Sequence, residues 1–126
     1  MLKDIENRDD LYLVVSEFYK KLLADQGINY FFEKFNDHKT LEKHLSILVD
    51  FWDNVLFYSG TYAKNAMMPH LNLHKKEPFS EDHFKIWLGH FNNSVDENFS
   101  GTNAHNLKIR ALSIATVMQI KIKELQ

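Results

Sequence analysis

The sequence contains no cysteine, only four glycines and two prolines, and no long apolar run. Without cysteine, disulfide bridges, thiolate metal sites and cysteine nucleophiles are excluded. A membrane-spanning helix needs about 18 to 20 consecutive apolar residues, so no spanning segment is predicted. The first six residues, Met1 to Glu6, are charged rather than followed by an apolar signal core. We therefore expect a cytoplasmic protein without a membrane partner.

Charges of one sign do not form blocks either. The chain has 15 basic and 17 acidic residues and a formal net charge of −2. Binding to a phosphate backbone needs a concentrated basic stretch, so nucleic acid is not an expected partner. The length of 126 residues is about that of one domain, and we predict a single domain over residues 1–126.

Signatures of several enzyme classes are also missing. The sequence has no Gly-rich phosphate loop, no Gly-x-Ser-x-Gly elbow and no dinucleotide-binding fingerprint. Neither an alternating strand pattern nor an internal repeat occurs. The remaining pattern is helical, so we predict an all-α fold and neither a serine enzyme nor a phosphate enzyme.

Apolar residues at steps of three and four predict four long helices. We expect them at about residues 8–23, 37–60, from 81 onward and 103–125, with Ser80 as the cap of the third. A short aromatic segment, Tyr30 to Phe35, separates the first two. The buried face of the second helix is expected to contain these residues: Leu41, His44, Leu45, Leu48, Phe51, Trp52, Val55 and Tyr58.

Four residues with polar or aromatic side chains are candidates for one shared cavity. Tyr19, His44 and Trp87 are in phase with the apolar stripes of separate helices, and His70 lies between the second and third helices. A phenol, an indole and two imidazoles around one pocket suggest bound haem, with His70 as the iron ligand. Its other ring N–H would then donate to a backbone carbonyl near Ala66.

Each residue also has an ordinary structural interpretation. A tyrosine, tryptophan or histidine on an apolar helical face is usually a core residue whose polar atom has a hydrogen-bond partner. His70 differs, because the segment around it has poor helical periodicity and Pro69 precedes it, where proline suits the first turn of a short helix. A metal bond would hold such a segment in place.

A different metal site is the main alternative within this segment. His70 and His74 are four residues apart and could meet a divalent ion from one helical face. Zinc or di-iron is disfavoured, because the sequence has no His-Glu-x-x-His and no Glu-x-x-His element. The other histidines are expected in solvent or at helix ends: His38, His83, His90 and His105.

With these residues in order, the chain resembles a truncated haemoglobin of group III over nearly its whole length. The matching elements are Phe18-Tyr19, His44 with Phe51-Trp52 seven and eight residues later, His70-x-x-Leu73 and Ile86-Trp87-Leu88. They correspond to the group's distal tyrosine, distal histidine, proximal histidine and distal tryptophan. The double-glycine motifs of the other two truncated groups are absent.

The resemblance implies a shortened globin with helices packed two over two around haem b. It implies His70 as the metal ligand, and a haem lining of Phe32, His44, Leu48, Met67, Leu73 and Trp87. The chain departs from the group around Pro69, which directly precedes the proximal histidine, while Pro78 follows late. His74 is therefore a minor rival as iron ligand.

Tyr19, His44 and Trp87 are the residues expected to act on a ligand. Tyr19 and Trp87 are the candidate hydrogen-bond donors, and His44 is a third donor, a gate that swings toward solvent or a sixth ligand to the iron. A bound diatomic molecule such as O2 or NO carries partial negative charge, which hydrogen-bond donors stabilise by about 1.5 to 3 kcal/mol each. Two such donors slow ligand release, which suits ligand activation or detoxification better than bulk transport. The alternatives are a redox enzyme, a nitric oxide dioxygenase or peroxidase-like protein with a reductase partner, and a cofactor-free helical interaction module.

Overall fold

The computed structural model describes residues 1–58 and 79–124, with the side chains given up to residue 121. Five helical elements occur in these ranges: α1 (Arg8–Ala24), the 3-10 helix η1 (Asn29–Asn36), α2 (His38–Phe57), α4 (Glu81–Asp96) and α5 (Thr102–Glu124). The two ranges contain no strand, so the all-α prediction is confirmed. In neither range is a helix both long enough and apolar enough to cross a membrane.

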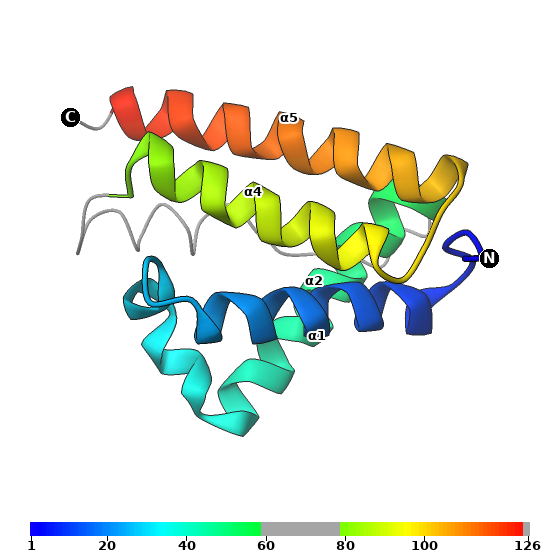
Figure 1. Cartoon of the computed structure of the whole chain (residues 1–126), viewed down its shortest axis with the longest axis horizontal. Helices are drawn as coiled ribbons and strands as arrows, with labels where there is room; N and C mark the ends of the chain where they lie inside the picture. The colour runs from blue at the N-terminus through cyan, green and yellow to red at the C-terminus, as the bar shows by residue number, and fades with distance from the viewer. Residues whose placement is uncertain (59–78, 125–126) are drawn as a thin grey trace.

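The four long helices form two pairs (Figure 1). α4 and α5 lie side by side along one side of the molecule, and α1 crosses below them with α2 behind it. α1 is the central element, because it packs against α4 on one side and against α2 and η1 on the other. A side chain on α1 can therefore meet residues of α2, α4 and η1.

Helix beginnings follow the expected capping chemistry. Asn7 accepts a hydrogen bond from the backbone N–H of Asp10 at the start of α1, and Asp37 accepts one from that of Thr40 at the start of α2. Ser80 caps α4 as predicted, and the side chain of His83 completes a capping box by accepting from the Ser80 backbone N–H. These caps satisfy donors that the first turn of a helix cannot satisfy internally.

The apolar stripes of α1, α4 and α5 are buried as the sequence predicts. The core contains these members of the three stripes: Leu11, Val14, Phe18 and Leu22; Phe84, Trp87, Phe91, Val95 and Phe99; Leu107, Ala111 and Met118. Aromatic rings dominate the contact between α1 and α4, where Phe18 meets both Trp87 and Phe91 edge-on. Such ring pairs contribute about 0.5 to 1.5 kcal/mol beyond the burial of their area.

The prediction for the C-terminal end of α2 is wrong. The helix ends at Phe57 rather than near Gly60, and Tyr58 is 85% exposed instead of buried. Tyr58 takes the left-handed conformation with φ of 55°, which ends the helix and turns its ring away from the core.

The buried face of α2 is also rotated by about one residue from the predicted one. Leu45, Leu48, Val49 and Trp52 are buried, while His44, Phe51 and Val55 are only half-buried. α2 has apolar residues on two adjacent faces, and periodicity alone does not tell which of them packs on α1. The half-buried face lies beside the packed one and is therefore available to line a site.

The segment before α1 is hydrogen-bonded to the turn between α4 and α5 and to the start of α5. The Asp4 carboxylate accepts hydrogen bonds from the backbone N–H groups of Asn103 and Ala104, both at 2.9 Å, and so caps the start of α5. The Ser100 N–H donates to the Lys3 carbonyl, and the side chain of Ile5 is fully buried. Figure 1 shows the N-terminus beside the turn between α4 and α5.

Some predictions fall on residues 59–78, outside the described part of the chain. They concern the proposed iron ligand His70, its rival His74 and the lining residues Met67 and Leu73. The prediction of one domain over residues 1–126 likewise stays a prediction.

Candidate functional site

Tyr19 and His44 meet inside the protein. The distance between the Tyr19 hydroxyl oxygen and His44 Nε2 is 2.7 Å, a short hydrogen bond between α1 and α2. The Tyr19 side chain is only 1% exposed, while His44 is half-buried. The pair thus joins a fully enclosed phenol to an imidazole that lies closer to solvent.

Aromatic rings surround the Tyr19 phenol. Phe18, Phe32 and Phe35 meet it edge-on, with centroid distances of 5.3, 5.9 and 5.5 Å. Phe32 and Phe35 come from η1, so this short helix supplies one wall of the site. The surroundings have a low dielectric constant, and a hydrogen bond there is stronger than the same bond in water.

Burial raises the pKa of Tyr19 far above its ordinary value of 10. The phenol therefore keeps its hydrogen at neutral pH. If His44 Nε2 is the unprotonated nitrogen, the phenol donates to it. If Nε2 carries the hydrogen, it donates to the phenol oxygen and the phenolic O–H is left for another acceptor.

Trp87 reaches the same cluster through one intermediate ring. Its indole meets the ring of Phe18 edge-on at 5.4 Å, and Phe18 in turn meets Tyr19. Trp87 is buried on α4 and stacks on Phe91, with the two ring planes 12° apart. Tyr19 and Trp87 therefore belong to one aromatic cluster, joined through Phe18 on α1.

The structure thus brings together most of the site residues that lie in its described part. Tyr19 and His44 are in contact, Phe32 packs on Tyr19, and Trp87 is one ring away. Leu48 is buried on α2, four residues after His44. Phe35 was not predicted as a site residue, although its position in the aromatic segment 30–35 could have indicated it.

The half-buried side of α2 borders a small groove. Phe51 and Val55 line it from α2, and Arg110, Ser113 and Ile114 line it with Val117 from α5. Its volume is about 220 Å³. The groove is mostly apolar, as expected for a region between two helices whose facing residues are hydrophobic.

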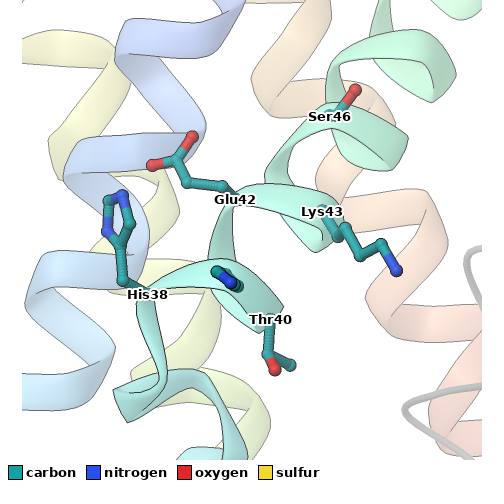
Figure 2. A pocket seen from close by; sticks show the side chains of 6 residues that line it. His38, Thr40, Glu42, Lys43 and Ser46 are labelled. Carbon is teal, nitrogen blue, oxygen red and sulfur yellow. The ribbon is translucent and has the colours of Figure 1, made fainter.

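A second groove, of about 630 Å³, lies on the first turns of α2. Its lining contains His38, Lys39, Thr40, Glu42, Lys43 and Ser46. Figure 2 shows that these side chains spread around the helix, with Lys43 and Glu42 pointing to different sides. The groups do not converge on one point, and Tyr19 and His44 are not among them, so the chemistry of the candidate site lies elsewhere.

Two further histidines have specific partners. His90, expected in solvent, is half-buried on α4, and its Nε2 lies 2.7 Å from a carboxylate oxygen of Asp25. This hydrogen bond holds the pKa of Asp25 below its usual value. His83 lies at a helix end as predicted, where Nε2 is also 3.0 Å from the Tyr30 hydroxyl. Both histidines link α4 to the segment between α1 and α2.

Comparison with known proteins finds similarity both to a curated protein and to a solved structure. No family model matches the chain. The group 3 truncated haemoglobin ctb of Campylobacter jejuni is 24% identical over 115 residues, which cover 90% of this chain and 88% of that protein. The crystal structure of the group III truncated haemoglobin from Campylobacter jejuni has a TM-score of 0.84 at 23% identity, covering 97% of this chain and 95% of the other.

These comparisons confirm the predicted resemblance and the predicted fold. The chain resembles group III truncated haemoglobins in sequence along most of its length and has the same shortened globin fold. The two helix pairs, α1 with α2 and α4 with α5, form its two-over-two arrangement. The roles of individual residues are not tested by a likeness at this identity and stay predictions.

Proposed function

Because the chain resembles group III truncated haemoglobins and has their fold, we propose that it is a haem protein that binds O2 or another diatomic ligand. The observation that carries this proposal is the contact between the Tyr19 hydroxyl and His44 Nε2 at 2.7 Å within a cluster of aromatic rings. A buried pair of neutral hydrogen-bonding groups suits a small, polarised, uncharged ligand. It suits a phosphate or a carboxylate substrate poorly.

The described residues fit a haem. A porphyrin needs a broad apolar lining, and η1 and the half-buried side of α2 offer Phe32, Leu48, Phe51 and Val55. His44 lies at one end of that side, where its imidazole reaches Tyr19. The side of α2 that carries Phe51 and Val55 therefore leads to the pair of polar groups.

We assign the proximal side to the segment outside the described residues. His70 is the proposed iron ligand, with Met67 and Leu73 against the porphyrin edge. Among the described residues, Phe32, Leu48 and Trp87 would hold the porphyrin. Haem b would supply the iron atom that binds the diatomic molecule and exchanges electrons with it.

Tyr19, His44 and Trp87 are the proposed hydrogen-bonding residues toward the ligand. The raised pKa of Tyr19 keeps its phenol in the donating form. When His44 Nε2–H donates to the phenol oxygen, the phenolic hydrogen is available to the ligand. When Nε2 accepts instead, the ligand and His44 compete for that hydrogen, so the tautomer of His44 decides which form is present.

Retention of the ligand favours ligand activation or detoxification over bulk transport. One donor that adds about 1.4 kcal/mol in the bound state slows release about tenfold. Two donors would slow release further and so favour reaction of the ligand with a second molecule such as NO, with a reductase as the electron source. The redox-enzyme alternative, NO dioxygenation or peroxidase-like turnover, uses the same residues.

The visible spectrum of the purified protein tests haem binding. We expect a strong Soret band, a haem b signature after extraction into pyridine, and loss or a large shift of the band in His70→Ala. His105→Ala on the exposed side of α5 is the matched control and should leave the spectrum unchanged. Failure of the purified protein to bind haem under reconstitution would overturn the proposal and favour the cofactor-free interaction module.

Turnover separates the ligand-binding role from the enzymatic one. Purified protein with NO, O2 and a chemical reductant should form nitrate in repeated cycles if the chain is a dioxygenase. Tyr19→Phe should then reduce the rate. A protein that holds O2 tightly but completes only a single cycle under these conditions would be a ligand binder without this activity.

A further inference from the structure

The imidazole of His44 meets the rings of Phe35 and Tyr19, which come from two other elements. The ring of Phe35, from η1, lies nearly parallel to the imidazole, with 4.5 Å between centroids and 21° between planes. The ring of Tyr19, from α1, is 5.1 Å away at 70°. Phe35 and Tyr19 also meet each other edge-on at 88°. The imidazole is therefore in contact with one ring face and one hydroxyl group at the same time.

The two contacts restrict different motions of the imidazole. The hydrogen bond to Tyr19 fixes the position of Nε2 but permits rotation of the ring about the line of the bond. The stacked face of Phe35 fixes the plane of the ring. Together they restrain both side-chain torsions of His44, which is half-buried.

Phe35 is itself held firmly. Its side chain is 3% exposed, and the ring of Phe32 lies 6.4 Å away and 29° from parallel. The ammonium group of Lys34 lies 5.1 Å from the centre of the Phe35 ring. The chain from Phe35 to α2 is short, because Asp37 immediately begins α2 as its cap. The stacking ring thus has a fixed relation to the helix that carries His44.

We infer that Phe35 is a positioning residue that holds the His44 imidazole in its inward position against Tyr19. It does not reach the ligand, and it acts through His44. The inference rests on the proposed function for its consequence, which is that Phe35 sets how often His44 swings toward solvent and opens the pocket. The stacking itself is a property of the protein with or without haem.

The reactivity of His44 toward diethyl pyrocarbonate measures this positioning directly. The reagent acylates accessible neutral imidazoles, and peptide mass spectrometry gives the rate at each histidine. In the purified protein, His44 should react more slowly than His38, which is exposed at the start of the same helix. In Phe35→Leu, the rate at His44 should rise roughly two- to tenfold, the range expected for loss of one aromatic pair.

Phe31→Leu is the matched control. Phe31 is on the same short helix and is likewise buried, but its ring contacts are Tyr30, Phe79 and His83. The substitution removes the same number of atoms and should lower the midpoint of thermal unfolding by a similar amount. The rate at His44 should stay at its wild-type value, as should the rate at His105 in both variants.

Ligand kinetics then show whether the effect passes through His44. Entry of carbon monoxide into the haem-loaded protein should be faster in Phe35→Leu than in wild type. In a His44→Ala background the same substitution should have no further effect on entry. An equal acceleration with and without His44 would mean that Phe35 merely fills space in the pocket, and would overturn the inference.

The outcomes separate this inference from the proposed function. Equal reactivity of His44 and His38 in the wild type would overturn the positioning role even if Phe35→Leu failed to fold. An equal increase in the acylation rate of His44 in Phe35→Leu and Phe31→Leu would also overturn the positioning role. Absence of a Soret band would instead overturn the haem proposal, while the acylation rates still decide the role of Phe35.

Discussion

Asp4 occupies the space that a side chain at Gly101 would need. A Cβ atom built on Gly101 would lie 2.5 Å from the Asp4 Cγ atom, well inside van der Waals contact. Gly101 also has a φ of +144°, a conformation that other residues rarely adopt. The close approach lets the Asp4 carboxylate reach the backbone N–H groups at the start of α5.

We expect Gly101→Ala to lower the free energy of unfolding by about 1 to 3 kcal/mol, from backbone strain and from displacement of Asp4. Gly89→Ala is the control, because a Cβ there has no atom within 4 Å and the residue lies within α4. That variant should match or exceed wild-type stability by up to about 1 kcal/mol. Urea denaturation measures both, and equal stabilities would contradict the prediction.

The Asp4 carboxylate should make stability depend on pH in the acid range. Partial burial opposes ionisation, but hydrogen bonds from the Asn103 and Ala104 backbone outweigh it and lower the pKa of Asp4. The stabilisation is therefore complete above the unfolded-state pKa of about 3.9 and is lost as the pH falls through the lower, folded-state value. Asp4→Asn should cost about 1 kcal/mol at neutral pH, as for loss of a charged cap.

The difference between wild type and Asp4→Asn should accordingly begin to shrink below about pH 3.9, where the unfolded chain binds the proton, and disappear only below the lower folded-state pKa of Asp4. Glu33→Gln, at an exposed position on η1, is the comparison for loss of one surface carboxylate. If the difference at Asp4 were constant from neutral pH to strongly acid pH, the carboxylate charge would have no part in capping α5.

Arg8 joins the start of α1 to two carboxylates of α2. Its guanidinium nitrogens lie 2.6 Å from Asp50 and 3.0 Å from Asp53. Asp53 is only 7% exposed, while Asp50 is more open to solvent. Double-mutant cycles with Arg8→Ala should therefore give a coupling of about 1 to 3 kcal/mol with Asp53→Asn.

The coupling with Asp50→Asn should be at most about 1 kcal/mol, and added salt should reduce it further. The shorter of the two contacts is thus expected to be the weaker, because solvent screens it. A larger coupling with Asp50 than with Asp53 would show that distance rather than burial decides the strength of this pair of interactions.

Much of the fold was predictable because it depends on local chemistry. The apolar stripes of α1, α4 and α5, and the strong cap Ser80, predicted the starts of these three helices to within a residue. α2 was harder, because it has two apolar faces. Which of them packs on α1 depends on the partner helices and not on α2 itself.

The candidate site was predictable only in part for a related reason. The resemblance to group III truncated haemoglobins singled out Tyr19 and His44, and their contact in the structure agrees with a shared cavity. The stacking of Phe35 on His44 was not foreseen, because three neighbouring phenylalanines on η1 are equivalent in the sequence. Their different roles arise from the geometry of a 3-10 helix against α1 and α2.

Substitution of Tyr19 tests the proposed distal residues most directly. Tyr19→Phe removes only the hydroxyl group, so the contacts of the ring with Phe32 and Phe35 and the fold should remain. If the phenol donates to the bound ligand, O2 release from the haem-loaded protein should become about tenfold faster, equivalent to about 1.4 kcal/mol. Stopped-flow displacement of O2 by carbon monoxide measures the rate.

Tyr12→Phe provides the matched control on the same helix. Tyr12 also uses its hydroxyl group in a hydrogen bond, to the Glu42 carboxylate at 2.9 Å, but it is exposed. Loss of that bond leaves the aromatic cluster intact, so O2 release should keep its wild-type rate. If both variants released O2 at the wild-type rate, the Tyr19 hydroxyl would serve only to hold His44. Faster release in Tyr19→Phe alone, with slow acylation of His44 preserved, would assign the phenolic hydrogen to the ligand rather than to the imidazole.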